Sequence, residues 1–270
     1  MLLGLSTSSF YDRWETEEAA AAISRLDLDC AEVFLQTQSE YTRSFARVVK
    51  RNLGDLPCET LHPLGTPFEN QLISRSQRQR KDARDLLCRI LDAGEELGAK
   101  YYVHHGRHTP RNEILPWNMT ANAEMIGIIE EEASKRGMHV AWENVCWCQL
   151  TTPERVRAAL EVLPDVRFTL DIKQAMKAGC DPVDFVHAMG KNLANVHVCD
   201  WDEQGKLCLP GEGAFDFAAF ADALRSVEYK GPIMIELYLA LIKSDESLRR
   251  SIRFMKNIIN NEGVTDDEQD

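Results

Sequence analysis

The sequence predicts an α/β protein, a single-domain (β/α)8 TIM barrel. Three observations support this prediction. Short apolar runs alternate with longer helical patterns along all 270 residues. Eight such pairs can be counted, at roughly 25–40 residues per pair, which is what a (β/α)8 barrel requires. No GxGxxG motif follows the first apolar run, which disfavours the rival fold, an open doubly wound sheet.

The strands are expected where the apolar runs occur. Several runs are nearly continuous rather than alternating, as expected of parallel strands that are covered on both faces. The expected strands are Leu2–Ser6, Ala31–Leu35, Cys58–His62, Tyr101–His104, His139–Glu143, Arg167–Asp171, Asn195–Val198 and Ile233–Glu236.

The helices are expected in the intervals between the strands. Thr152 begins a Thr-Pro-Glu start signal, Gly137 is a helix stop, and Asp216 and Ser244 are expected caps. A further short helical pattern follows Asp171. The longer helices are expected at Thr16–Leu26, Ser39–Lys50, Gln77–Leu97, Asn118–Arg136, Thr152–Leu163, Asp181–Met189, Asp216–Val227 and Ser244–Ile259.

Composition sets the domain count and excludes some functions. No linker-like shift in composition occurs, so one domain is expected over residues 1–262, followed by an acidic, disordered tail at 263–270. The net charge of −12 argues against a broad nucleic-acid surface. The sequence contains no run of 18 apolar residues, so a membrane span is not expected. The eight cysteines form no CxxC pair, which favours reduced thiols and a cytoplasmic location.

Polar side chains stand at the ends of four consecutive strands. These are Glu143, Asp171, His197 and Glu236. A single carboxylate in such a place is usually a turn or cap residue, but the strand ends of a barrel converge on one face. Three converging carboxylates would repel one another without a cation. The set therefore predicts a site for one divalent metal ion, Mn²⁺, Mg²⁺, Co²⁺ or Zn²⁺.

These residues resemble those of the xylose isomerase-like barrels, which include sugar and sugar-phosphate isomerases and epimerases and the class II AP endonucleases. The resemblance covers nearly the whole chain. It rests on Glu143 in AWENV, Asp171 in FTLDI, His197 in VHVCD and Glu236 in IELY, and on PGEGAFDF at 210–217, which matches a PGxGxxDF segment of the family.

The resemblance implies roles for individual residues. Glu143, Asp171, His197 and Glu236 would be the metal ligands, and the two glutamates would also be the catalytic acid/base pair. Two further histidines, on strands three and four, match residues that bind zinc in the endonucleases and line the pocket in the sugar enzymes; they are His62 and His104. From the residues alone, a scaffolding role remains open for these two histidines and for His105.

The chain departs from the family pattern at two places. Gln174 stands where the family commonly has the histidine of Asp-x-x-His. The endonucleases also have an Asp-x-His before the PGEG-like segment, whereas this chain reads DEQGKLCLPGEG there and has no histidine after His197. A trinuclear zinc site is therefore not expected, and a single-metal sugar enzyme fits better.

The predicted function is an isomerase or epimerase of a sugar or sugar phosphate that moves a proton next to a carbonyl through a metal-stabilised enediolate. The alternatives are an inosose-type dehydratase on the same centre and, less favoured, an AP endonuclease-like phosphodiesterase. A non-catalytic barrel that binds a sugar or a protein is disfavoured because all four ligands are present.

The expected binding partner is a small molecule, a sugar or sugar phosphate. Binding to a membrane or to nucleic acid is not expected, and assembly into a homo-oligomer is left open. Lys173 and Gln174, just beyond a ligand, are candidate substrate contacts, as are His62 and His104. Arg107 and Lys206, on loops after strands four and seven, could hold a phosphate or acid group or could simply be solvated.

Overall fold

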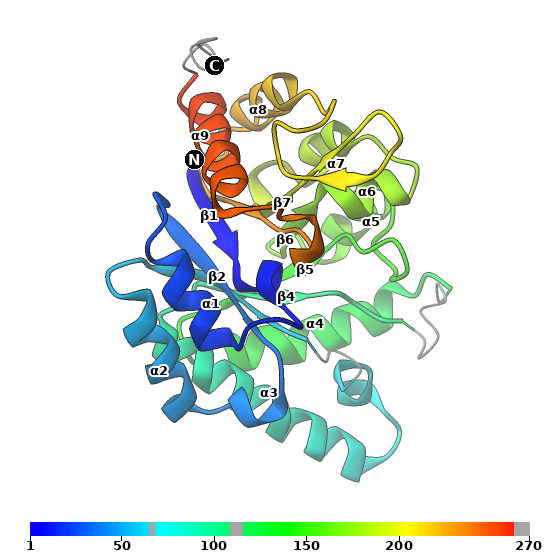
Figure 1. Cartoon of the computed structure of the whole chain (residues 1–270). Coiled ribbons are helices and arrows are strands. Elements are labelled where there is room, and N and C mark those ends of the chain that lie inside the picture. Colours follow the sequence, from blue (N-terminus) through cyan, green and yellow to red (C-terminus); the bar gives the residue numbers. More distant parts are fainter. Residues whose placement is uncertain (65–67, 109–115, 262–270) are drawn as a thin grey trace, which may run out of the picture.

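The computed structural model describes residues 1–64, 68–108 and 116–261. Eight parallel strands close into a barrel in the order β1-β10-β7-β6-β5-β4-β3-β2, with helices around it (Figure 1). The barrel strands are β1 (Leu2–Ser6), β2 (Cys30–Leu35), β3 (Cys58–Pro63), β4 (Tyr101–His104), β5 (His139–Glu143), β6 (Arg167–Asp171), β7 (Leu193–Val198) and β10 (Pro232–Ile235). The predicted single-domain (β/α)8 barrel is confirmed, and every expected strand lies within two residues of an observed one.

The helices also follow the prediction closely. They are α1 (Thr16–Ile23), α2 (Arg43–Leu53), α3 (Gln77–Leu97), α4 (Met119–Ser134), α5 (Pro153–Val162), α6 (Ile172–Lys177), α7 (Pro182–Met189), α8 (Phe217–Ser226) and α9 (Asp245–Asn260). The second helix begins later than expected because Thr42, not Ser39, is its cap: the Thr42 hydroxyl accepts from the backbone N–H of Phe45.

In the described part of the chain, five short 3-10 turns lie between these elements: η1 (Thr7–Phe10), η2 (Gln38–Glu40), η3 (Glu69–Ile73), η4 (Gly190–Asn192) and η5 (Leu239–Leu241). The last helix, α9, packs beside β1 near the amino terminus (Figure 1). The expected acidic tail and the end of the expected domain at residue 262 lie outside the described residues. Within the described part, no helix is both long enough and apolar enough to cross a membrane.

The main core lies between the strands and the surrounding helices. Its largest fully buried side chains include Trp142, Tyr102 and Phe168 on neighbouring strands. Full burial of one large apolar side chain contributes about 1.5–3 kcal/mol. This shell holds the strands rigidly, so their carboxyl ends can present polar groups in fixed positions.

The PGEGAFDF segment at 210–217 has a structural explanation. After β7 the chain forms a small antiparallel hairpin of β8 (Asp200–Trp201) and β9 (Leu207–Cys208). The buried Asp200 carboxylate accepts backbone N–H groups of Gly211, Gly213 and Phe215, each at 3.0 Å. A Cβ atom at Gly213 would overlap the Asp200 carboxylate, which explains the glycine. The segment is thus folded around one aspartate.

Candidate metal centre

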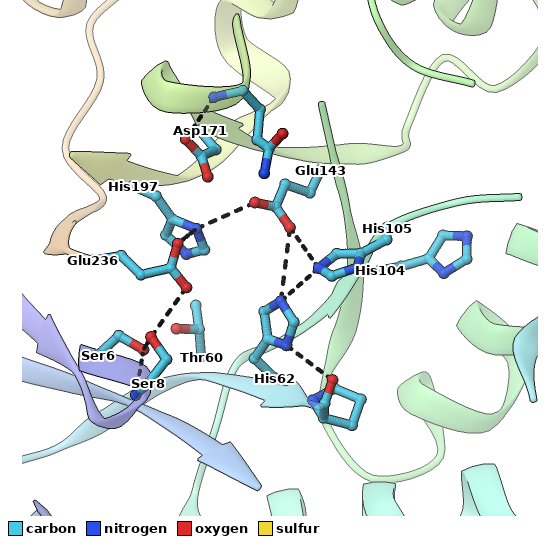
Figure 2. Close-up of polar contacts among 12 residues, drawn as sticks. Ser6, Ser8, Thr60, His62, His104, His105, Glu143, Asp171, His197 and Glu236 are labelled. Atoms are coloured by element: carbon cyan, nitrogen blue, oxygen red, sulfur yellow. Dashed lines mark hydrogen bonds and ion pairs between the residues drawn. The ribbon is translucent and has the colours of Figure 1, made fainter. Parts of the chain in front are cut away.

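The structure brings the four predicted ligands together at the carboxyl ends of the strands. Glu143 ends β5, Asp171 ends β6, His197 lies in β7 and Glu236 follows β10. One potential ligand atom from each lies within 4.8 Å of the others (Figure 2). The His197 Nδ1 atom is 3.4 Å from Glu143 Oε1 and 3.4 Å from Glu236 Oε2.

The donor set fits a divalent cation. Two buried atoms that face this centre, Asp171 Oδ2 and His197 Nδ1, have no hydrogen-bond partner. A buried polar atom without a partner is costly, so such atoms call for an explanation. Three carboxylates and one imidazole suit Mn²⁺, Co²⁺ or Zn²⁺, and the oxygen-rich set also admits Mg²⁺.

The charges of the centre are strongly coupled. Burial opposes ionisation of Glu143 and Glu236, but their basic neighbours, His105 beside Glu143 and Lys173 beside Glu236, help to hold both pKa values well below the usual range. Burial alone would lower the pKa of His197, yet nearby carboxylates raise it well above its usual value. Burial raises the pKa of Asp171, against the pull of Lys173. A divalent ion would add positive charge beside these carboxylates.

The two carboxylate oxygens of Asp171 have different surroundings. Its Oδ1 accepts the backbone N–H of Gln174 at 3.0 Å and so caps α6, while Oδ2 points to the centre (Figure 2). Asn144 fixes the backbone at this point, because its amide bonds both the N–H of Asp171, at 2.7 Å, and its carbonyl, at 3.0 Å. One oxygen of this side chain therefore caps a helix, and the other faces the candidate centre.

Glu32 is a member of the site that sequence reasoning missed. Its buried carboxylate lies 3.0 Å from His197 Nε2, on the side of the imidazole away from the other carboxylates. It also accepts the hydroxyl of Ser6 at 2.8 Å and that of Thr60 at 2.7 Å. The available signal was a lone acid inside the apolar run CAEVFL, since a buried carboxylate needs partners.

The prediction for the histidines of strands three and four needs correction for one of the two. His62 lines the cavity as expected. His104 does not: it is fully buried and its Nδ1 bonds Glu69 Oε2 at 2.8 Å, pointing away from the centre (Figure 2). His105 lines the cavity instead, because neighbouring residues at a strand end point in opposite directions. Its Nε2 is 2.8 Å from His62 Nε2 and 3.0 Å from Glu143 Oε2.

These two histidines and Glu143 form a second group whose atoms could hold a cation. It shares Glu143 with the first group. The glutamate therefore belongs to two sets of donors. One set is built on β5, β6, β7 and the end of β10, and the other on β3, β5 and the end of β4.

The other predicted contacts divide into two pairs. Lys173 and Gln174 line the cavity, and the Lys173 Nζ atom lies 3.3 Å from Asp171 Oδ2 and 3.2 Å from Glu236 Oε2. Arg107 and Lys206 are not among the residues that line it, and Lys206 is exposed in the β8–β9 hairpin. The residues that line the cavity therefore give no support to a phosphate contact by either side chain, and such a contact stays a prediction.

The cavity has a volume of about 640 Å³, within the range of small-molecule sites. Its polar floor meets an apolar wall that includes Tyr11, Phe34, Leu64 and Tyr238. Cysteine chemistry has no support here. All eight cysteines are free, and burial raises the pKa of Cys58, for example, to about 12.

Comparisons with known proteins agree with this architecture. A curated relative, the 3-dehydroshikimate dehydratase of Pseudomonas putida, is 27% identical over 242 residues, which cover 82% of this chain and 36% of that protein. The chain thus spans about a third of the length of that relative.

Two solved structures share the fold. A D-tagatose 3-epimerase-like protein has 19% identity and a TM-score of 0.74, over 97% of this chain and 98% of its own. The IOLI protein with a binding zinc atom has 15% identity and a TM-score of 0.75, over 98% of this chain and 100% of its own. A protein-family model described as "Xylose isomerase-like TIM barrel" matches residues 20–258. The chain therefore belongs to the xylose isomerase-like TIM barrel family.

Proposed function

We propose that this protein is a divalent-metal-dependent isomerase or epimerase of a sugar or sugar derivative. The observation that carries the proposal is that two glutamates that line the cavity, Glu143 and Glu236, both lie 3.4 Å from His197 Nδ1. The four residues Glu143, Asp171, His197 and Glu236 would hold the ion. When bound, the ion would stabilise negative charge on the carbonyl and neighbouring hydroxyl oxygens of the substrate.

The two glutamates would transfer the proton. One carboxylate would take the proton from the carbon next to the carbonyl, which leaves an enediolate. Water, or the other glutamate after it has taken up a proton from water, would return a proton to the substrate. Both are held in place: Ser8 donates to Glu236 Oε1 at 3.1 Å, and His105 contacts Glu143 Oε2 at 3.0 Å. Their depressed pKa values keep both carboxylates ionised and able to accept a proton.

Lys173 and Gln174 would contact the substrate. The Lys173 ammonium is nearly buried beside Asp171 and Glu236 and lies 5.6 Å from the centre of the Tyr238 ring. It would donate to a substrate hydroxyl or oxyanion next to the centre. Arg107 and Lys206 do not line the cavity, but Arg13 and Lys173 do, so these two side chains would meet any acidic group of the substrate.

Dehydration on the same centre is the second candidate. The relative named 3-dehydroshikimate dehydratase favours it, and removal of a proton next to a carbonyl also begins a β-elimination. An endonuclease-like phosphodiesterase has one supporting observation, the second donor group of His62, His105 and Glu143. The net charge of −12 and the lack of a histidine after His197 argue against it.

Proton exchange tests the proposal. After reconstitution with Mn²⁺, a panel of keto-sugars in D₂O should show exchange of a carbon-bound proton in NMR spectra. Exchange without elimination supports an isomerase or epimerase, and loss of water supports the dehydratase. E143Q and E236Q should abolish the exchange, whereas E69Q, which changes a buried glutamate outside the cavity, should retain it. Failure to bind any divalent ion would refute every metal-dependent version.

A further inference from the structure

We propose that Glu32 is the positioning residue of the centre, and that it selects Nδ1 of His197 as the nitrogen that binds the metal. The inference rests on the proposed metal-dependent function and deepens it. Glu32 lies on β2 and would act only through His197, since its carboxylate is fully buried and does not line the cavity.

The contact between these residues crosses the inside of the barrel. β2 and β7 are not neighbours in the strand order, yet Glu32 Oε2 is 3.0 Å from His197 Nε2. In the strand register, Glu32 is paired with Ser6 on one side and Thr60 on the other. The barrel therefore builds a row of Ser6, Glu32 and Thr60 that holds the carboxylate from β1 to β3.

The neighbours of Glu32 decide which ring nitrogen of His197 carries the hydrogen. The hydroxyls of Ser6 and Thr60 both donate to Glu32, so the carboxylate is an acceptor. A hydrogen bond to the imidazole then requires the hydrogen on His197 Nε2, which leaves Nδ1 to face Glu143 and Glu236.

Asn195 defines the competing arrangement. Its Nδ2 atom is 2.9 Å from His197 Nε2 and 3.4 Å from Glu32 Oε2. If this amide donated to Nε2, the hydrogen of a neutral imidazole would sit on Nδ1 and would block the metal. A fully buried, ionised carboxylate accepts more strongly than a neutral group, so Glu32 favours the tautomer that can bind the metal.

A carboxylate behind a ligating histidine fixes the orientation of the ring and increases the basicity of the ligating nitrogen. Loss of such a partner typically weakens metal binding by about 10–100-fold. We therefore expect Glu32 to control metal affinity without touching metal or substrate.

The chain offers a closely matched control. Glu69 is also a buried glutamate on an imidazole, with 2.8 Å between its Oε2 and His104 Nδ1, and it accepts a second bond from the Tyr102 hydroxyl at 2.6 Å. This pair lies outside the candidate centre. E32Q and E69Q thus make the same chemical change, and a general effect of losing a buried charge should appear in both.

The first measurement is the affinity for Zn²⁺ and Co²⁺ by chelator competition, together with the visible spectrum of the Co²⁺ form. E32Q should bind about 10–100-fold more weakly and show an altered spectrum, while E69Q should match the unaltered chain. The second measurement is the ¹⁵N spectrum of the His197 ring in the Zn²⁺ form, which should show a hydrogen on Nε2 and ligation through Nδ1.

If E32Q does not fold, T60V and T60S provide the test, because valine removes one donor to Glu32 and serine retains it. T60V should weaken metal binding and T60S should restore it. Equal affinities of E32Q and E69Q, unchanged affinity in a folded T60V, or ligation through Nε2 would each overturn the inference alone. A chain that binds no divalent ion would overturn the proposed function as well.

Discussion

The cap role of Asp171 and its proposed role as a metal ligand can be separated by two substitutions. Asparagine keeps an oxygen that can cap α6 but lacks the charge that a metal ligand needs, whereas alanine lacks both. Asn and Asp are equivalent as caps, and loss of a cap to alanine costs about 1 kcal/mol. We therefore expect D171N to fold with the stability of the unaltered chain in the absence of metal, and D171A to be about 1 kcal/mol less stable.

The electrostatic surroundings support this expectation. Burial, with repulsion from Glu143 and Glu236, raises the pKa of Asp171 in spite of Lys173, so the site without metal disfavours the charge that D171N removes. With metal at 100 times its Kd, the unaltered chain gains about 2.7 kcal/mol. At about 2–4 °C per kcal/mol, this is a rise in Tm of roughly 5–10 °C. Both variants should lose most of this rise.

The assay is thermal and urea unfolding with and without Mn²⁺. Asp216 is the matched control, because it caps α8 through the backbone N–H of Ala219 at 2.9 Å and lies outside the centre. D216A should lose about 1 kcal/mol and keep the full metal-dependent rise. If D171N retains the rise, Asp171 is not a ligand. If D171N is as unstable as D171A without metal, the cap does not explain its structural role.

Three further predictions concern other parts of the chain. Despite burial, Glu32 and other carboxylates raise the pKa of His197, so a metal ion must displace a proton from the imidazole. The affinity for the metal should therefore rise with pH and level off above that pKa. Calorimetry in buffers of different ionisation enthalpy measures the released proton. Burial opposes ionisation of Glu132, but hydrogen bonds from three basic side chains lower its pKa to about 2. The stabilisation that ionised Glu132 provides is present above pH 4.5 and lost toward pH 2. The free energy of unfolding of E132Q should therefore depend less steeply on pH in this window. G213A should lower Tm, because the added methyl group overlaps Asp200.

Each of these has a clear contrary result. Metal affinity that does not change with pH would show that no proton is displaced from the imidazole. An acid-unfolding curve of E132Q parallel to that of the unaltered chain would remove the role assigned to the basic side chains around it. An unchanged Tm of G213A would mean that the segment from 210 to 217 can shift away from Asp200. The matched control for the last is G127A, since nothing lies within 4 Å of an added Cβ there.

The sequence was informative where local physics decides the structure. Strand positions followed from continuous apolar runs. Helix starts followed from capping residues such as Asp216 and Ser244, whose side chains accept the backbone N–H groups of Ala219 and Ser247. The convergence of Glu143, Asp171, His197 and Glu236 followed from barrel geometry, because each stands at the carboxyl end of a strand.

Local pattern could not decide the direction of a side chain at a strand end. His104 and His105 are adjacent and chemically identical, and only the path of the chain leaving β4 decides that His105 enters the cavity. Arg107 and Lys206 looked equally suitable for a phosphate, yet neither is among the residues that line the cavity. Loop conformation depends on packing against other elements, which no short stretch of sequence records.

The sequence by itself determined the fold class, the order of elements and the four-residue centre, because apolar periodicity, capping and strand-end chemistry act over a few residues. Only the tertiary structure decided what surrounds that centre. Glu32 reaches His197 across 165 positions of chain, and the two meet only because the strands close into a barrel. The nitrogen that His197 offers to a metal is therefore a property of the closed barrel and not of any local motif.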